Sequence, residues 1–524
     1  MDKINKSVCQ KGGVHIIDFL LMCYIMIGAL NLCLITEEEI NGFLVIRWGM
    51  LCLCYVIARC LVNKRWMLWG IGLAGAIEAI WALSQQIGWV DSNHSIFDVT
   101  GTLGNPGQLA GFLSVALTVM FGLYLLYRQR KFIKWLILSL SLLMILVLVL
   151  SDSRAGWVAA LAGSSFVWRV WGRIKRTNLL FKISIGILGF LLCAGAYYYK
   201  KDSADGRLFI WRIATDMIAD APILGHGIGA FGKKYMYYQA QYFESYPLSE
   251  YIKLADNVIY PYNEFLHVGV EMGMLGILLV VLIIIALAWR VPLQEENMIY
   301  MGGFIALMVF SIFSYPSYVL LLMLLFPVLL GGIVCRREMR LFSTLAYKYA
   351  WWGVCGFTAC LLGKGYYTFY LLEKNVEKLY SSSSSDMVSA EKYIEMHYED
   401  LRAIPGFLDL YAQYCYKTFP VSASLPVLKD AAIIIPTSEL FCDLGNLYKD
   451  AGDMKRAVEC YSLASCMIPN RLLPKYELFV LYQEIGDTLL ARQIGETILS
   501  MVVKVESTET LKIKGGVKRY LEKE

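Results

Sequence analysis

Three residues that can exchange protons recur at helical spacing near the middle of the chain. Glu264, His267 and Glu271 lie three and four residues apart, in a stretch that begins at 260 with YPYNEFLH. Residues at these spacings share one face of a helix. The residues that follow are mostly apolar, and ionisable groups are costly inside a membrane helix. The stripe therefore indicates a functional site, and an interhelical hydrogen-bonding role is the alternative.

Arginines stand in two further short motifs. Arg154 lies in SRAG at 153–156, while Arg207 and Arg212 lie in GRLFIWR at 206–212. The planar guanidinium group suits bidentate recognition of phosphate. Arg154 could instead snorkel to the interface or pair with Asp152, and 205–212 could be a solvated loop helix. Since Arg207 and Arg212 are five residues apart, a shared helical face is not assumed.

Two glycine-rich stretches predict tight turns. Residues 101–111 read GTLGNPGQLAG, and residues 220–231 read DAPILGHGIGAF. The first is expected to lead into a membrane span and to cap it. The second is expected to follow a short amphipathic helix at 205–212.

The composition indicates a polytopic membrane protein. Hydrophobic residues make up 57% of the chain, charged residues 17%, and the mean hydropathy is +0.53. Apolar blocks of about 20 residues match the length that crosses a ~30 Å hydrocarbon core. We expect about eleven spans, at roughly 14–35, 42–61, 66–86, 108–127, 132–150, 155–171, 180–199, 262–289, 299–315, 317–335 and 349–371. The first block lacks a small-residue cleavage site, so a cleavable signal peptide is not expected.

The 14 cysteines are mostly inside apolar blocks, where they act as small hydrophobic residues. Metal-type Cys/His spacing is not apparent, so we expect no metal and no cofactor.

The distribution of charged residues over the loops predicts the orientation of the chain in the membrane. Cations cluster at 3–11, 59–65, 128–134, 169–176 and 336–348, on one set of alternating loops. The opposite loops include 36–41, with three glutamates, and 85–107, without lysine or arginine. The positive-inside rule places the N-terminus in the cytoplasm and, with an odd number of spans, the C-terminus outside. We expect a multi-pass protein of the bacterial inner membrane, for which the outside is the periplasm.

The last part of the chain shows the spacing of a tetratricopeptide repeat. Residues 438–471 place large and small packing residues at the positions of that 34-residue unit: Phe441, Leu444, Gly445, Tyr448, Ala457, Tyr461, Ala464 and Pro469. The same pattern moved forward by 34 residues is matched by Tyr482, Gly486, Asp487 and Ala491. Moved backward by 34 residues, it is matched more weakly, with Tyr414 in place. We predict an all-α chain in three parts: a transmembrane domain at 1–372 with a large periplasmic loop at 200–261, a linker at 373–403 that contains the serine run 381–385, and an α-solenoid at 404–524.

The motifs taken in order resemble the O-antigen ligase/polymerase superfamily of bacterial membrane glycosyltransferases, over about residues 95–335. The stretches GNPGQLAGFL, SRAGW, GRLFIWR with DAPILGHGIGAF, and YNEFLHVGVEMGMLG carry the resemblance. It implies a GT-C-like helical fold and transfer of an undecaprenyl-pyrophosphate-linked glycan at the periplasmic face. It also implies that Arg154 and Arg207, with Arg212 nearby, bind the donor pyrophosphate, where fixed cations would stabilise the leaving group.

One position departs from the family. Where the family often has His-Asn, this chain has Tyr262-Asn263. Tyrosine is a poor base near neutral pH, since its reference pKa is about 10. Glu264 or His267 could serve as the base instead, or the reaction could need less base assistance. The candidate catalytic residues are therefore Tyr262, Asn263, Glu264 and His267.

The leading hypothesis is a metal-independent glycan ligase or oligosaccharyltransferase whose acceptor is a lipid A core, a protein or another glycan. A polymerase of O-antigen or exopolysaccharide is the close alternative. A lipid-linked glycan transporter and an assembly scaffold are alternatives of another class. The repeats could bind a protein partner, and a nucleic-acid partner is not expected.

The orientation is testable with reporter fusions. Alkaline phosphatase fused after residue 524 should be active, because that enzyme requires the periplasm, and a cytoplasmic reporter at the same position should be silent. Fusions at the N-terminus should give the reverse pattern. A C-terminal fusion active in the cytoplasm would contradict the predicted topology.

Overall fold

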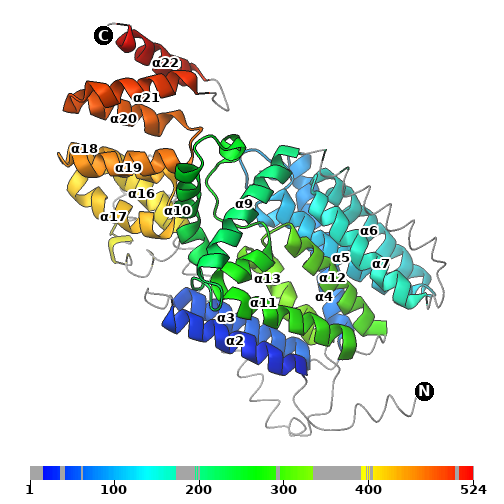
Figure 1. Ribbon diagram of the computed structural model, residues 1–524. Coiled ribbons are helices and arrows are strands. Elements are labelled where there is room, and N and C mark those ends of the chain that lie inside the picture. The colour runs from blue at the N-terminus through cyan, green and yellow to red at the C-terminus, as the bar shows by residue number, and fades with distance from the viewer. Residues whose placement is uncertain are drawn as a thin grey trace. The chain divides into compact units, whose positions relative to one another are not determined.

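The computed structural model describes residues 16–35, 42–60, 63–172, 201–290, 295–333, 405–501 and 507–522, with isolated residues between 195 and 198 and between 391 and 401. Every regular element in these ranges is a helix (Figure 1). The all-α prediction is thus confirmed for this part of the chain. The predicted spans at 180–199 and 349–371 and the serine run lie outside the described residues.

The chain divides into two compact units. The first is drawn from Met1–Lys201 and Tyr262–Gly363, and the second from Asp202–Pro261 and Lys364–Glu524. The large loop at 200–261 therefore groups with the C-terminal helices, although the sequence motifs assign it to the membrane domain.

The first unit contains the apolar helices. They are α2 (Ile16–Leu34), α3 (Gly42–Cys60), α4 (Arg65–Gln86), α5 (Pro106–Tyr127), α6 (Lys131–Leu150), α7 (Arg154–Trp171), α11 (Glu264–Arg290), α12 (Glu295–Ile312) and α13 (Leu320–Ile333). Short 3₁₀ turns, η1 (Gly101–Leu103) and η3 (Pro316–Tyr318), precede α5 and α13. Among the described residues, α2, α4, α5, α6 and α11 are long and apolar enough to cross a membrane. This agrees with a multi-pass membrane protein, while the number eleven stays a prediction.

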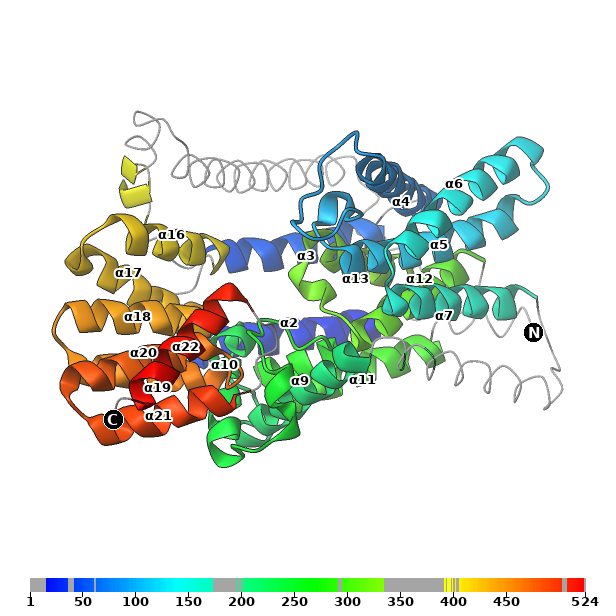
Figure 2. The same ribbon diagram turned by 90° about the horizontal axis from the view of Figure 1, so that it is seen from above.

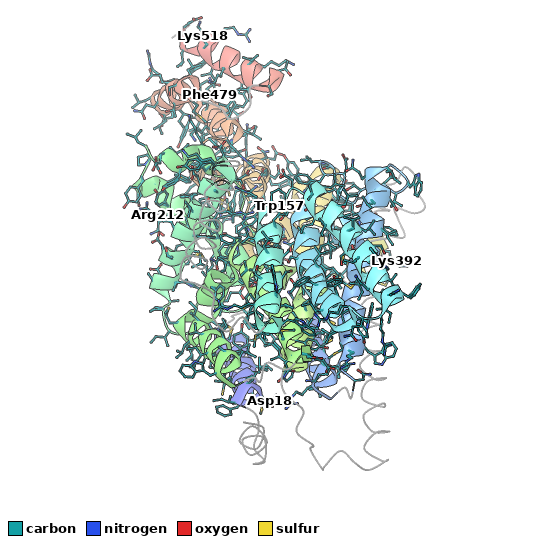
Figure 3. All side chains as sticks on the ribbon, turned by 90° about the vertical axis from the view of Figure 1, so that its right-hand side faces the viewer. Asp18, Trp157, Arg212, Lys392, Phe479 and Lys518 are labelled. Atoms are coloured by element: carbon teal, nitrogen blue, oxygen red, sulfur yellow. The ribbon has the colours of Figure 1, made fainter. Side chains whose placement is uncertain are left out.

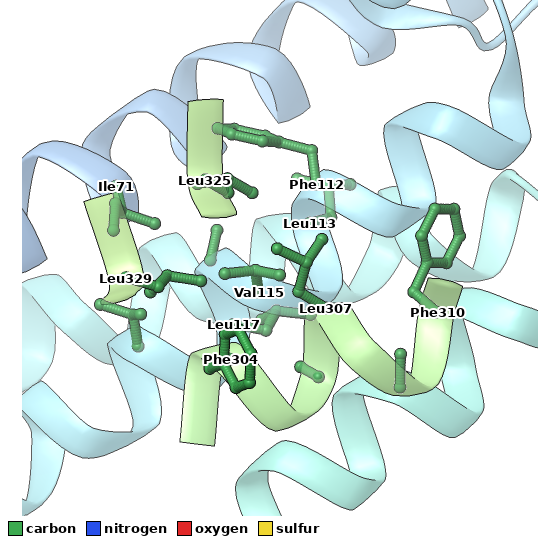
Figure 4. Close-up of a cluster of buried hydrophobic side chains, with 14 of the residues drawn as sticks. Ile71, Phe112, Leu113, Val115, Leu117, Phe304, Leu307, Phe310, Leu325 and Leu329 are labelled. Atoms are coloured by element: carbon green, nitrogen blue, oxygen red, sulfur yellow. The ribbon is translucent and has the colours of Figure 1, made fainter. Parts of the chain in front are cut away.

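Helix α5 is the centre of this unit and packs against α4, α6, α7 and α12. Its side chains Leu113, Val115 and Leu117 gather with Leu307 of α12 and Leu329 of α13 (Figure 4). Small residues allow the closest approaches between helices, as is usual for membrane helices. A Cβ added at Gly163 of α7, for example, would lie 2.7 Å from the backbone oxygen of Gly302 in α12.

The outer surface of the unit is also apolar. On α6, Phe132, Trp135, Leu142 and Val149 are all more than half exposed. Such side chains suit contact with lipid, where an exposed polar group would be left without a hydrogen bond.

The second unit contains two helices from the loop and a row of C-terminal helices (Figure 2). The loop forms α9 (Lys201–Asp220), α10 (Ala230–Ser245) and the 3₁₀ turn η2 (Glu250–Leu254). Helix α9 is longer than the short helix expected at 205–212. The C-terminal helices are α16 (Pro405–Thr418), α17 (Val421–Ile434), α18 (Ser438–Asp450), α19 (Met454–Met467), α20 (Leu472–Ile485), α21 (Thr488–Ser500) and α22 (Thr508–Leu521). Each of these helices packs against the next.

The central pair, α18 and α19, packs through the residues that the repeat pattern singled out. Ala457, Tyr461 and Ala464 are fully buried, and a Cβ at Gly445 would lie 2.4 Å from the Tyr461 ring. One predicted repeat length separates two similar turns, in which Asp453 and Asp487 cap the following helices. The structure thus contains the expected helical hairpins, and their assignment as tetratricopeptide repeats stays a prediction.

Asp443 on α18 allows a test of the burial in this pair. Burial raises the pKa of its carboxyl to about 6, although Lys417 lowers it. The folded-state pKa therefore exceeds the unfolded value of about 3.9, so the ionised carboxylate destabilises the fold at neutral pH and less so as the pH falls. Asp443→Asn should raise the unfolding free energy of these helices by about 1–2 kcal/mol at pH 7.5 and by less at pH 5.

Hydrogen exchange of α18 and α19 in the full chain, corrected for the intrinsic effect of pH, measures this. Asp450→Asn, an exposed change on the same helix, is the control and should have little effect. An equal gain in unfolding free energy at pH 7.5 and pH 5 would contradict the assignment of the effect to the Asp443 carboxylate.

Candidate functional site

The first turn of α11 is built by Tyr262 and Asn263. The Asn263 side chain accepts hydrogen bonds from the backbone N–H groups of Phe265 (2.9 Å) and Leu266 (3.2 Å), so it caps the helix. Tyr262 has φ 52°, in the left-handed region that non-glycine residues rarely adopt. Its ring meets the Tyr315 ring edge-on, with centroids 5.2 Å apart. The Tyr-Asn pair thus forms the turn into α11, and strain of this kind gathers at functional sites.

His267 lies between two carboxylates on the next turns of the same helix. Its Nδ1 is 3.2 Å from Glu264 Oε2, and its Nε2 is 3.0 Å from Glu271 Oε1. The three side chains are only 11–13% exposed. The spacing in the sequence therefore predicted a real cluster, which we call the acid–histidine cluster.

The loop between α12 and α13 completes this cluster from the other side. The backbone N–H of Ser317 donates to Glu264 Oε1 at 2.9 Å, and Ser317 Oγ lies 3.4 Å from His267 Nδ1. The Tyr318 hydroxyl lies 3.1 Å from His267 Nε2, and the two rings pack at 5.0 Å. These contacts fix the orientation of the imidazole ring, so its two nitrogens face defined partners.

Arg47 of α3 holds that loop in place. Its guanidinium group donates to the carbonyl oxygen of Ser317 and lies 2.9 Å from Met323 Sδ. Arg47 thus contacts the loop that carries Ser317 and Tyr318, and these two residues in turn contact His267.

Sequence reasoning missed these supporting residues. The spans predicted at 299–315 and 317–335 leave a single residue between them, whereas the helices end at Ile312 and begin at Leu320. The interruption of an apolar run by SYPSY at 314–318 was the available signal. Arg47 carried the usual signal of a charge within an apolar block.

Arg154 is the first residue of α7, just after the turn from α6. In that turn Asp152 has φ 49°. Trp157, labelled in Figure 3, donates from its Nε1 to the backbone carbonyl of Leu148 in α6 at 2.8 Å. Gly156 lies against α5, where an added Cβ would be 2.7 Å from the Ala110 Cβ. The SRAG motif therefore sets the start of α7 and its close crossing with α5, and so the place of Arg154.

The stretch 101–111 forms the turn and cap that its glycines predict. Asn105 caps α5 by accepting from the N–H of Gly107 at 2.8 Å. Two buried polar residues of α4 hold the preceding turn: Glu78 accepts from the N–H of Thr102 at 2.9 Å, and Gln85 accepts from the N–H of Gly101 at 2.8 Å. These contacts show that the residues of 101–111 serve to form the turn and to cap α5. Glu78 and Gln85 were not singled out from the sequence.

Arg207 and Arg212 both lie on α9, where five residues correspond to a rotation of about 140°. They therefore point in different directions. Arg212, labelled in Figure 3, is exposed. Its guanidinium carbon lies 5.2 Å from the centre of the Tyr242 ring. Arg207 is half-buried. A single phosphate group contacted by both side chains does not follow from this geometry.

The second glycine-rich stretch joins α9 to α10. Gly225, Gly227 and Gly229 all have positive φ, as its turn requires. His226 Nε2 lies 2.7 Å from the carbonyl oxygen of Met217 on α9, which ties the turn to that helix.

The predicted site residues are divided between the two units. Tyr262, Asn263, Glu264 and His267 belong to the first unit together with Arg154, whereas Arg207 and Arg212 belong to the second. The structure brings Glu264 and His267 into contact, and a common pyrophosphate site for the arginines stays a prediction. Within the described ranges, no group of three or more His, Cys, Asp or Glu side chains is suited to hold a metal ion.

The described residues form helices, several of them apolar and long enough to cross a membrane, and they enclose the buried acid–histidine cluster. These features are those of a multi-pass membrane protein with a polar site. Comparison with protein families refines this class. Residues 139–281 match the O-antigen ligase family, and this range contains Arg154, Arg207 and the whole acid–histidine cluster. This match supports the resemblance to the O-antigen ligase superfamily that the sequence motifs carry.

A curated relative points the same way. The protein described as "Putative polysaccharide ligase" from Rickettsia typhi is 26% identical over a stretch that covers 32% of this chain and 47% of the relative. The chain thus spans about half the length of that relative. No solved structure matches the chain significantly.

The two glycines beside the predicted arginines have different surroundings, which gives a matched test. Gly156→Ala should lower the yield of folded, monodisperse protein, because its Cβ would meet α5 at 2.7 Å. Gly206→Ala, just before Arg207, has no atom within 4 Å of its Cβ and should leave the yield unchanged or higher, since alanine favours a helix. Fluorescence-detected size exclusion of both variants measures this, and equal yields would contradict the close packing of α5 and α7.

Proposed function

We propose that this protein is a polysaccharide ligase that transfers a glycan from undecaprenyl pyrophosphate to an acceptor hydroxyl at the periplasmic face of the inner membrane. The observation that carries the proposal is the O-antigen ligase match over 139–281, which includes both the acid–histidine cluster and the motif arginines. The similarity to a protein named as a polysaccharide ligase favours a ligase over a polymerase.

The acid–histidine cluster would activate the acceptor. The carboxylate of Glu264, which the N–H of Ser317 orients, can take a proton from the acceptor hydroxyl. His267, with each ring nitrogen 3.0–3.2 Å from a carboxylate, would hold Glu264 in place. Tyr262, the residue in place of the family's histidine, then shapes the turn and has no part in proton transfer.

The arginines would stabilise the leaving group. As the acceptor oxygen bonds to the anomeric carbon, the bond from that carbon to the pyrophosphate oxygen breaks, and negative charge grows on the pyrophosphate. Fixed guanidinium groups directed at that charge lower the barrier without rearrangement of solvent. We assign this role to Arg154 at the start of α7 and to Arg207 on α9. Arg212, which packs on Tyr242, would act at most on the outer part of the donor.

The C-terminal hairpins are proposed to be tetratricopeptide repeats in the same compartment as the site. The spacing of their caps and the burial of Ala457, Tyr461 and Ala464 support this assignment.

The proposal predicts the effect of removing single side chains. Arg154→Ala and Arg207→Ala should each lower glycan transfer by about 10²–10³-fold, the usual loss for one group that stabilises developing charge. Glu264→Gln should lower it by about 10²–10⁴-fold, the usual contribution of a general base. Lys201→Ala, which removes an exposed cation from α9, is the control and should retain transfer.

The assay uses membranes that contain equal amounts of each variant, with a lipid-linked oligosaccharide as donor. Normal transfer by both arginine variants would contradict the proposal. A deletion strain separates the two enzyme classes, because loss of a ligase leaves full-length lipid-linked chains and loss of a polymerase leaves single repeat units.

A further inference from the structure

The loop at 202–261 is fastened to one end of the central pair by specific polar contacts. That end consists of the start of α18 and the residues that follow α19, where helices leave backbone groups without partners inside the helix. All of the residues involved belong to the second unit. We call this set of contacts the loop clamp, and it comprises Gln239, Asp256 and Asn257 from the loop with Ser438, Glu439, Met467, Asn470 and Arg471 from the central pair.

Gln239 of α10 is the most buried member of the clamp, with no exposed surface. Its side-chain amide donates at 2.7 Å to the carbonyl oxygen of Met467, the last residue of α19. The same amide donates at 3.1 Å to the carbonyl of Asp256 in the loop. One side chain thus joins α10, the end of the loop and the C-terminus of α19.

Asn470 makes the reciprocal contact from the central pair. It is 9% exposed, and its amide donates to the carbonyl oxygens of Ile252 (2.8 Å) and Ala255 (3.4 Å) in the loop. Backbone carbonyls of a 3₁₀ turn are therefore satisfied by a residue that lies more than two hundred positions further along the chain.

Asn257 closes the other side of the clamp at the start of α18. Its Oδ1 accepts from the N–H of Ser438 at 3.2 Å, and its Nδ2 donates to Glu439 Oε2 at 2.5 Å. Arg471 pairs with Glu439 and, at 3.3 Å, with Asp256. Donors and acceptors of the loop and the helix ends therefore match each other.

Apolar contacts continue from the clamp to the arginine helix. Helix α10 packs against α19 and α17 (Figure 1), and the Tyr237 ring meets Phe441 of α18 at 6.1 Å. On the side toward α9, Phe209 packs against Phe243 at 5.4 Å and Tyr251 at 5.0 Å. Phe209 lies two residues after Arg207, so a continuous set of contacts leads from the central pair to that arginine.

We infer that the C-terminal helices act on their own chain, as a support that fixes the position of α9 and therefore of Arg207. This inference rests on the proposed function for the role of Arg207, but the docking itself does not depend on it. The end of the central pair is matched to the backbone carbonyls of Ile252 and Ala255 and to the side chain of Asn257, so the loop is its ligand. Gln239 and Asn470 are positioning residues for the donor site.

Two neighbouring glutamines on α10 allow a matched test. Gln239→Glu replaces the amide that donates to two carbonyls with a carboxylate that repels them, whereas Gln241→Glu makes the same chemical change at an exposed position. Hydrogen exchange is measured on the full chain in nanodiscs. With Gln239→Glu, exchange should rise about tenfold or more in α9, α10 and the ends of α18 and α19, because a buried hydrogen-bonded pair is lost. With Gln241→Glu it should match the wild type.

A second substitution separates docking from general folding. Gln239→Met keeps the volume and removes both donors, so it should give the same local rise in exchange while α20–α22 stay protected. Equal exchange of α9 and α10 in the Gln239 variants and in Gln241→Glu would overturn the docking.

The consequence for transfer is measured separately with lipid-linked oligosaccharide as donor. Loosening α9 should raise the half-saturating donor concentration severalfold, a change that a mere loss of folded protein would not produce. An unchanged half-saturating concentration despite raised exchange would overturn the support of the donor site. If the wild type transfers no glycan, the proposed function fails, and the exchange comparison still decides the docking.

Discussion

The structure of the candidate site depends on keeping two carboxylates and an imidazole together within the first turns of an apolar helix. Charged groups in such a place are costly unless each has a partner. Here Glu264 and Glu271 each contact His267, and Ser317 and Tyr318 supply further contacts. That need explains why the α12–α13 loop is polar, why Arg47 is directed at it, and why Asn263 caps α11 at this point.

The sequence predicted the parts of this arrangement that depend on local spacing. Helical periodicity placed Glu264, His267 and Glu271 on one face, and apolar length placed α4, α5, α6 and α11 close to their observed bounds. Repeat spacing likewise singled out Gly445 and Tyr461 as packing residues, and the structure brings the two into contact. Each of these features is determined by residues close together in the chain.

The parts that could not be predicted depend on long-range contacts. Ser317 and Tyr318 lie about fifty residues from His267, and Arg47 more than two hundred, so no local pattern links them. The loop clamp is harder still, because half of its partners are backbone carbonyls and carry no sequence signal. The close contact of Gly156 with α5 shows the same limit: the sequence marks the glycine beside Arg154, but only the packing shows that it is needed for a helix crossing.

The similarity of residues 139–281 to the O-antigen ligase family, the acid–histidine cluster and the proposed support of α9 by the C-terminal helices lead to one account. In this account a site in the membrane domain activates an acceptor, and the chain's own hairpins hold the donor-binding helix. The most direct test is to incubate the purified full-length protein with an undecaprenyl-pyrophosphate oligosaccharide and a lipid A core acceptor, and to quantify both products. The account predicts equimolar formation of glycosylated acceptor and free undecaprenyl pyrophosphate. An unchanged amount of donor, or release of undecaprenyl pyrophosphate without formation of a new glycosidic bond, would contradict it.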